Sequence, residues 1–288
     1  FFFMDDTQLS RKTFHCPVIL THTNSGVAAL RRRLNQLNVS SSMYRLMTID
    51  GWAIKLLSLF PKRGQIDSNI LALKNPNSDY SRIKAAAWHL LKGRHIQNIL
   101  RASYERLIVD EYQDCTIAQH RIIFRASEIL PTCVLGDPMQ AIFGWSGKDR
   151  AENLADWDKH VCEHFPIKDK LEIPHRWIKA EAEDFGYWLL DVRQRLMRGE
   201  QIALTDSPQE VDWLHLDGTE DRVRQIRAGN TQAITNNGGV LIIGESKSPR
   251  SQQEFEYQIS SAKTVESVEL KDMLYFAKDF DFQATDAC

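Results

Sequence analysis

Two short, wholly apolar stretches that run directly into polar residues constrain the fold of this chain more than any other feature. Residues 107–109 (Leu-Ile-Val) are followed at once by Asp110 and Glu111, and residues 133–135 (Cys-Val-Leu) are followed by a Gly-Asp pair. Strands that are apolar throughout belong to parallel sheets whose two faces are both covered by helices. We therefore predict an α/β fold with a parallel sheet, and we expect the polar residues to lie at the carboxyl edge of that sheet.

The other patterns of the first half fit such a sheet. Residues 17–20 predict a strand, and residues 27–37 predict a helix because their apolar side chains recur at helical spacing. The stretch over residues 61–81 is rich in Pro, Asn, Ser and Lys and predicts a loop, whereas residues 82–103 are amphipathic and predict a helix. We expect residues 61–103 as a whole to form an insertion in the core sheet.

The pattern changes in the second half of the chain. Residues 171–174 predict a short strand or turn, and apolar side chains on one face predict a long helix over residues 185–196. Alternation over residues 211–216 and an apolar run over residues 240–243 predict two further strands.

The whole-chain charge excludes little. Lys and Arg total 36 and Asp and Glu total 38 among 288 residues, which gives a formal net charge of −2. This balance does not indicate nucleic-acid binding, although a local basic patch would suffice for it. The five cysteines are scattered without a CxxC pair, which is typical of free thiols in a reducing compartment. Since no apolar run is long enough to span a bilayer, we expect a cytoplasmic protein with no membrane partner.

Asp110 and Glu111 form the first candidate catalytic pair. A parallel strand delivers ligand-binding groups at its carboxyl end, where Asp110 can hold Mg²⁺ directly or through water. Glu111 can orient and deprotonate an attacking water. The alternative, a strand end covered by acidic surface residues, is the commoner explanation of a bare Asp-Glu pair. The longer string Asp-Glu-Tyr-Gln-Asp over residues 110–114 favours the catalytic interpretation.

A second candidate element follows the strand at residues 133–135. Gly136 permits a turn, and Gln140 can donate a hydrogen bond to a phosphate or to the attacking water. Phe143 and Trp145 are aromatic residues of the following loop. An exposed aromatic ring can stack on a base of single-stranded DNA, which contributes about 1–3 kcal/mol per base. Core packing is the alternative for both rings, because apolar side chains are usually buried.

These elements resemble the motifs of a known family. Residues 109–114 resemble motif II of the UvrD/Rep/PcrA helicases of superfamily 1, and residues 136–145 resemble their motif III. Three less specific segments occur in the expected order along the chain. Residues 19–24 resemble motif Ia, residues 48–52 resemble the DNA-contact motif that follows it, and residues 171–176 resemble motif IV.

The resemblance, which extends over about residues 17–180, implies a fold and its ligands. Residues 1–150 would form a RecA-like P-loop NTPase domain, a parallel sheet with a helical insertion over about residues 61–103. Residues 151–288 would form part of a second RecA-like motor domain. The family is one of ATP-dependent DNA helicases, so the resemblance implies ATP and Mg²⁺ as cofactors and single-stranded DNA as a partner.

The resemblance also implies roles for individual residues. Asp110 would hold Mg²⁺ and Glu111 would be the general base, while Gln140 and Arg176 would contact the γ-phosphate of ATP. For Arg176 a surface ion pair is the alternative. Five residues would contact single-stranded DNA: Thr23, Asn24, Thr48, Phe143 and Trp145.

The chain departs from the family pattern in two ways. The family usually has an aromatic residue where His22 stands and a histidine where Asp50 stands. Its first motif, a glycine-rich phosphate loop ending in Gly-Lys-Ser/Thr, precedes motif Ia, whereas the residues before Pro17 contain no glycine. The later pair Gly147 and Lys148 is followed by Asp and does not match. We expect this chain to lack the phosphate loop and the family's last motifs, and to be inactive on its own.

The implied function of the intact protein is ATP-dependent unwinding of DNA, 3′ to 5′, in DNA repair, replication restart or defence against phage. The alternative is a helicase-like subunit that binds DNA or a partner nuclease in a repair or anti-phage complex without hydrolysing ATP. The missing loop favours the alternative, whereas the complete polar set of motifs II and III favours the enzyme. An in-frame Gly-Lys-Ser/Thr loop encoded upstream of Phe1 would distinguish them.

Two further clusters have functional and structural interpretations. His160, Cys162 and His164 include metal ligands, and the two histidines would share a helix face. A structural zinc site needs about four ligands, however, and no second cluster is near in sequence. The three arginines at residues 31–33 can face DNA phosphates or form a solvated helix face.

Overall fold

The computed structural model describes most of the first two hundred and thirty residues and less of the remainder. The described residues are 15–141, 154–232, 241–243, 249–259 and 263. The predicted DNA-contact residues Phe143 and Trp145, and the pair Gly147 and Lys148, lie outside these ranges.

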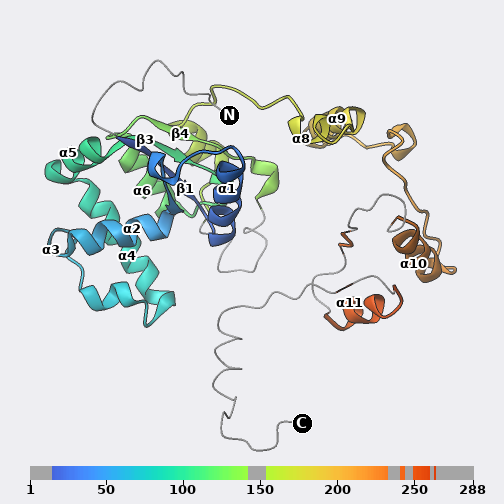
Figure 1. The fold of residues 1–288 in the computed structure, drawn as a ribbon, viewed down its shortest axis with the longest axis horizontal. Helices are drawn as coiled ribbons and strands as arrows, with labels where there is room; N and C mark the ends of the chain where they lie inside the picture. Colours follow the sequence, from blue (N-terminus) through green and yellow to red (C-terminus); the bar gives the residue numbers. More distant parts are fainter. Residues whose placement is uncertain (1–14, 142–153, 233–240, 244–248, 260–262, 264–288) are drawn as a thin grey trace, which may run out of the picture. The chain divides into compact units, whose positions relative to one another are not determined.

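A four-stranded parallel sheet organises the first part of the chain (Figure 1). The strand β1 (Cys16–Thr21) has β2 (Arg45–Thr48) on one side and β3 (Tyr104–Val109) on the other, and β4 (Thr132–Val134) flanks β3. Each neighbouring pair is parallel, so all four carboxyl ends lie at one edge of the sheet. The predicted parallel α/β fold is therefore confirmed.

Three helices follow the carboxyl ends of strands, and a threonine directly before the first residue caps each of them. These helices are α1 (Asn24–Gln36), α2 (Ile49–Leu59) and α6 (Ile117–Ser127). A threonine hydroxyl at the N-cap accepts a backbone N–H of the first turn, which is otherwise without an intrahelical partner. The three capping residues are Thr23, Thr48 and Thr116. At α6 the side chain of Gln119 completes a capping box by accepting the N–H of the capping threonine.

The insertion between α2 and β3 is helical, but the loop expected over residues 61–81 is wrong. The insertion consists of α3 (Pro61–Gly64), the 3-10 helix η3 (Ser68–Ala72), α4 (Pro76–Leu91) and α5 (Arg94–Ser103). Helical structure therefore begins at the first residue of the insertion.

Two prolines explain why this stretch was mistaken for a loop. Proline lacks a backbone N–H, which makes it well suited to the first position of a helix. Pro61 and Pro76 occupy such positions in α3 and α4. At the start of α4 the buried carboxylate of Asp79 accepts the backbone N–H of Asn75 at 2.9 Å. The polar residues that predicted a loop thus begin helices.

A hydrophobic core joins the sheet to the helices and to the insertion. The central strands contribute fully buried side chains, and Trp52 of α2 is also fully buried. Burying one such side chain contributes roughly 1.5–3 kcal/mol. The insertion adds further buried residues to the same core: Ile83, Ala87, Leu90, Leu91, Ile96 and Leu100. The sheet edge that carries the candidate site is therefore held by a packed scaffold.

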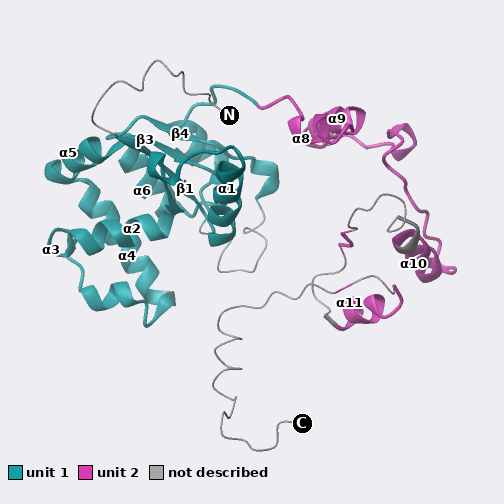
Figure 2. Ribbon diagram, viewed as in Figure 1, with its two compact units in different colours: residues 1–170 teal, residues 171–288 magenta. Residues whose placement is uncertain are grey.

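The chain divides into two compact units, residues 1–170 and residues 171–288 (Figure 2). The described elements of the second unit are helices: α8 (His175–Ile178), α9 (Glu183–Met197), η8 (Leu204–Asp206), α10 (Asp221–Gln232) and α11 (Pro249–Glu256). The long helix predicted over residues 185–196 is confirmed by α9. None of the described helices is both long enough and apolar enough to cross a membrane.

The strands predicted in the second unit are wrong where the structure describes them. Residues 171–174, 211–216 and 241–243 form no strand. A strand needs a neighbour to complete its backbone hydrogen bonds, and the described residues of this unit contribute no strand to the sheet. The sequence patterns are present, but the described residues of this unit provide no strand with which they could pair.

Candidate functional site

The backbone after β3 makes a sharp turn that is fixed by the neighbouring strands. The N–H of Asp110 donates to the carbonyl of Leu20 at the end of β1, at 2.8 Å. The next residue, Glu111, has a left-handed backbone with φ of 55°. The 3-10 helix η4 (Tyr112–Asp114) follows, and its first N–H donates to the carbonyl of Leu135 at 3.0 Å. A non-glycine residue in this conformation costs about 1–3 kcal/mol and is concentrated at functional sites.

A line of hydrogen bonds joins Glu111, two residues after the end of β3, to the segment after β4. Gln113 donates from Nε2 to Oε2 of Glu111 at 2.6 Å, and its Oε1 accepts the backbone N–H of Asp137 at 3.0 Å. Gln140, at the end of the 3-10 helix η5 (Pro138–Gln140), donates to Oδ2 of Asp137 at 2.8 Å. We call these four residues the Glu111–Gln140 line. The structure thus links two of the predicted catalytic residues at one edge of the sheet.

Gly136 allows the two ends of this line to approach each other. A Cβ at this position would lie 2.9 Å from Oε1 of Gln113 and 3.0 Å from the ring of Trp157. A side chain at this position would therefore require Gln113 or Trp157 to shift. Trp157 begins the π-helix η7 (Trp157–Cys162), an element that is rare and often found at functional sites.

Electrostatics at the end of β3 suit a bound cation. Burial raises the pKa of Asp110, and the neighbouring Glu111 carboxylate raises it further. A backbone hydrogen bond and the more distant Arg33 guanidinium lower the pKa. A divalent cation would offset both the burial and the repulsion between the carboxylates, because its charge favours the ionised form.

The donor set fits Mg²⁺ bound together with a phosphate. The described residues contain no group of three or more His, Cys, Asp or Glu side chains placed to hold a metal ion by themselves. Mg²⁺ commonly takes one or two carboxylates and completes its shell with water and phosphate oxygens. Asp110, with Glu111 beside it, provides such a partial shell.

Two of the predicted DNA-contact residues have a structural role that accounts for their identity. The hydroxyl of Thr23 accepts the N–H of Gly26 at 3.0 Å, and the hydroxyl of Thr48 accepts the N–H of Gly51 at 3.0 Å. Both threonines therefore cap helices at the carboxyl edge of the sheet. Asn24 is exposed in the first turn of α1.

A charged network that the sequence did not indicate lies close to this edge. Asp50 in the first turn of α2 pairs with Lys84 of α4 at 3.6 Å and accepts a hydrogen bond from Gln119 of α6 at 3.2 Å. The network ties the insertion to the helix that follows the acidic pair. Burial lowers the pKa of the nearby His22, although the Asp114 and Asp50 carboxylates act in the opposite direction. The residues at the two positions that depart from the family pattern thus lie in one electrostatic environment.

The histidines that suggested a metal site form an aromatic hydrogen-bonded cluster instead. Tyr112 bonds through its hydroxyl to Nδ1 of His120 at 2.9 Å, and Nε2 of His120 lies 3.3 Å from Nδ1 of His164. Nδ1 of His160 accepts the backbone N–H of Asp156 at 2.9 Å. The described residues contain no group of three or more His, Cys, Asp or Glu side chains placed to hold a metal ion, and these contacts do not support the zinc interpretation.

Arg176 is exposed in α8 of the second unit. Its expected contact with the γ-phosphate therefore rests on the sequence resemblance. Of the predicted catalytic residues, the first unit contains Asp110, Glu111 and Gln140.

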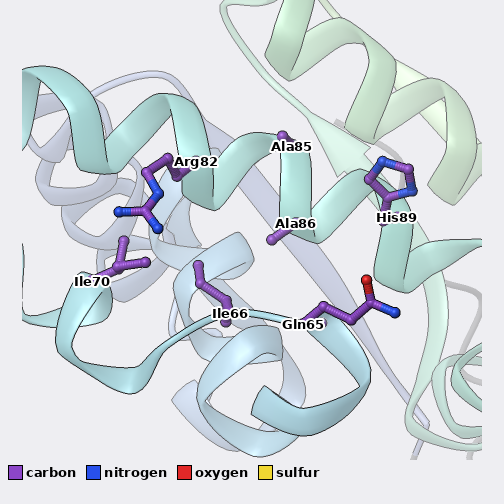
Figure 3. A pocket seen from close by; sticks show the side chains of 8 residues that line it. Gln65, Ile66, Ile70, Arg82, Ala85, Ala86 and His89 are labelled. Atoms are coloured by element: carbon purple, nitrogen blue, oxygen red, sulfur yellow. The ribbon is translucent and has the colours of Figure 1, made fainter.

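A separate cavity of about 300 Å³ lies on the insertion (Figure 3). Its lining comes from the segment after α3 and from one face of α4. Figure 3 shows Arg82 and His89 projecting from α4, with Gln65, Ile66 and Ile70 on the facing segment. None of the predicted site residues lines this cavity.

The fold and the site together define a class of protein. A parallel sheet with helices, in which adjacent strands end in an acidic pair and a glutamine, is the arrangement of a RecA-like α/β domain. Residues 70–161 match the family model described as the UvrD/REP helicase N-terminal domain. This match supports a UvrD/Rep/PcrA-type helicase fragment.

Curated relatives support the same family. The chain is similar to the ATP-dependent DNA helicase PcrA of Staphylococcus aureus strains Mu50, COL and MRSA252, with 30% identity over 121 residues in each case. The similar region covers 38% of this chain and 16% of each relative. The chain thus spans a small part of the length of the relatives it matches.

Proposed function

We propose that this chain is part of an ATP-dependent DNA helicase or translocase motor, and that the carboxyl edge of its sheet is the site of ATP hydrolysis. The observation that carries the proposal is the Glu111–Gln140 line. Three hydrogen bonds, which run through Gln113 and Asp137, connect the carboxylate of Glu111 with the carboxamide of Gln140 at one edge of the sheet. In the intact protein the motor would unwind DNA 3′ to 5′, as the family resemblance implies.

Each of these residues would have a separate role in ATP hydrolysis. Mg²⁺ would neutralise charge on the phosphates when it is bound. Asp110 would hold the ion, and Glu111 would accept the proton of the attacking water. Gln140 would exchange its bond to Asp137 for one to the γ-phosphate or the water. For Arg176, the family resemblance implies a contact with the γ-phosphate.

Single-stranded DNA is the proposed polymer on which the motor acts. Thr23, Asn24 and Thr48 lie at the carboxyl ends of β1 and β2, at the same edge as the acidic pair. Phe143 and Trp145 would stack on bases, as the resemblance implies.

A second candidate is a helicase-like subunit that binds DNA or another protein, such as a nuclease, without hydrolysing ATP. One observation favours it. Within the described residues, no turn that follows a strand carries a glycine-rich loop ending in Gly-Lys-Ser/Thr. Such a loop normally cradles the phosphates with backbone N–H groups and a lysine.

Equilibrium binding of a fluorescent ATP analogue, with and without Mg²⁺, distinguishes the two candidates. The proposed motor site predicts weak binding that Mg²⁺ strengthens and that chelation of the metal reverses. Asp110→Asn should remove the gain from Mg²⁺, whereas the matched control Asp212→Asn, at an exposed carboxylate of the second unit, should retain it. An affinity for the ATP analogue that neither Mg²⁺ nor Asp110→Asn changes would favour the non-hydrolysing subunit.

A further inference from the structure

We propose that Gln113 is a positioning residue that fixes the side chain of Glu111 and couples it to the segment after β4. The inference rests on the proposed function, in which Glu111 is the general base. Gln113 would not touch the nucleotide or the water, and it would act through the carboxylate that it holds.

The geometry leaves one orientation for the Gln113 carboxamide. A carboxamide has a donor end and an acceptor end, and the two are distinguished by their partners. The backbone N–H of Asp137 can only donate, so the group 3.0 Å away must be the oxygen of Gln113. The nitrogen must then face Glu111, whose carboxylate oxygen lies 2.6 Å away. Both ends of the side chain are thus committed.

The surroundings of Gln113 keep it in this position. The residue is 4% exposed, although the Glu111 that it contacts is exposed. Gly136 packs so closely that even a Cβ there would lie 2.9 Å from Oε1 of Gln113, and the ring of Trp157 closes the other side of the glycine. A buried polar group of this kind is costly to displace, because its partners would be left without hydrogen bonds.

The consequence for Glu111 is a fixed carboxylate on a strained backbone. Its φ of 55° lies in the left-handed region, and the bond from Gln113 holds one of the two carboxylate oxygens. The other oxygen is the one that can accept a proton from a water. Any movement of the Asp137 backbone, for example when Gln140 binds a phosphate, would be transmitted to Glu111 through the same carboxamide.

A charge-swap cycle tests the contact without a nucleotide. Gln113→Glu retains the acceptor for the N–H of Asp137 but sets a second carboxylate against Glu111, beside Asp110 and Asp137. Repulsion raises the pKa of such a pair, so the penalty is small at low pH and grows as the pH rises above the ordinary carboxylate range. We expect a melting temperature several degrees below that of the parent near pH 8, and a smaller difference near pH 5.

The swap variant Glu111→Gln/Gln113→Glu restores one donor and one acceptor with the direction reversed. It should recover most of the melting temperature near pH 8, and the exposed control Gln36→Glu should show no comparable pH dependence. Hydrogen exchange at the Asp137 amide provides a second readout. Gln113→Leu should accelerate exchange there, whereas Gln113→Glu should not.

The proposal is overturned if Gln113→Glu behaves like Gln36→Glu at both pH values, or if the swap variant is no more stable than Gln113→Glu. Neither result depends on nucleotide binding. A failed swap cycle with intact Mg²⁺-dependent binding would therefore remove the positioning role alone. A successful cycle without such binding would remove the proposed function alone.

Discussion

The two units of the chain differ in what surrounds their apolar side chains. In the first unit Trp52 and Leu107 are 0% exposed, because the sheet, its helices and the insertion enclose them. In the second unit Trp213 is 53% exposed and Leu241 is 81% exposed. Trp213 and Leu241 therefore gain less from burial than Trp52 and Leu107 do. An apolar segment stabilises a fold only when a neighbouring element covers it.

The second unit does contain local packing. Trp177 of α8 meets the ring of Phe185 of α9 edge-on, with centroids 4.7 Å apart. A Cβ at Gly186 would lie 2.8 Å from side-chain atoms of both Pro174 and Trp177. The two helices thus pack closely around a glycine, which is a contact between neighbours in sequence.

The largest expected effect that tests this comparison is the loss of the buried tryptophan. Trp52→Ala should lower the free energy of unfolding by about 3–5 kcal/mol, because it leaves a cavity in the core. Trp213→Ala should change it by less than about 0.5 kcal/mol, since the ring is already half exposed. Urea denaturation followed by circular dichroism measures both. Equal effects of the two variants would contradict the contrast between the units.

A smaller effect is expected on DNA binding. If the proposed base stacking is correct, Trp145→Ala weakens the affinity for single-stranded DNA by about 1–3 kcal/mol, whereas Trp213→Ala leaves it unchanged. Titration of a labelled oligonucleotide gives both affinities. If a folded Trp145→Ala variant binds single-stranded DNA with the parent's affinity, the result supports the alternative that this ring packs in the core.

A third effect concerns pH and the histidine cluster of the first unit. Burial, helped by His164 and His160, lowers the pKa of His120 to about 4. The unfolded chain, with a histidine pKa of about 6.5, therefore takes up this proton first. Stability should fall as the pH drops from about 6.5 towards about 4, by at most about 1.4 kcal/mol per pH unit.

His120→Gln should remove this part of the pH dependence, and the exposed control His215→Gln should leave it in place. Denaturation midpoints near pH 7 and pH 5 are sufficient for the comparison. If the stability of His120→Gln falls with pH as steeply as that of the parent, the cluster does not lower the proton affinity of His120.

The parallel sheet was predictable from the sequence because short apolar segments mark several of its strands. Residues 107–109 form the end of β3, residues 133 and 134 lie in β4, and the helices followed from their periodicity. The insertion was only partly predictable, since Pro61 and Pro76 begin helices although their polar neighbours suggested a loop. The strands of the second unit failed for a different reason: alternation shows which side chains share a face but not whether a partner strand exists.

The candidate site was predictable only as a set of strand-end residues. The string over residues 110–114 and the segment ending at Gln140 were identified from their order. The hydrogen bonds that connect them could not be predicted, because the bond from the Asp137 backbone to Gln113 joins residues 24 positions apart in the sequence. The pairing of Asp50 with Lys84 likewise depends on how the insertion folds against α2.

If the edge with Asp110 and Glu111 is the proposed site of ATP hydrolysis, we expect this chain to hold the phosphates too weakly for rapid turnover, because its described strand ends carry no glycine-rich phosphate loop. A phosphate cradle supplies positioning and charge stabilisation, each contributing several kcal/mol to lowering the barrier. At about 1.4 kcal/mol per tenfold in rate, its loss reduces turnover by several orders of magnitude.

The most direct test is phosphate release by the folded chain at saturating single-stranded DNA, with Glu111→Gln as the paired variant. The account predicts a rate several orders of magnitude below the roughly 1–10³ s⁻¹ of ordinary enzymes. DNA-stimulated release within that ordinary range, abolished by Glu111→Gln, would contradict it, because the phosphates would then be held by residues of this chain that the account does not recognise.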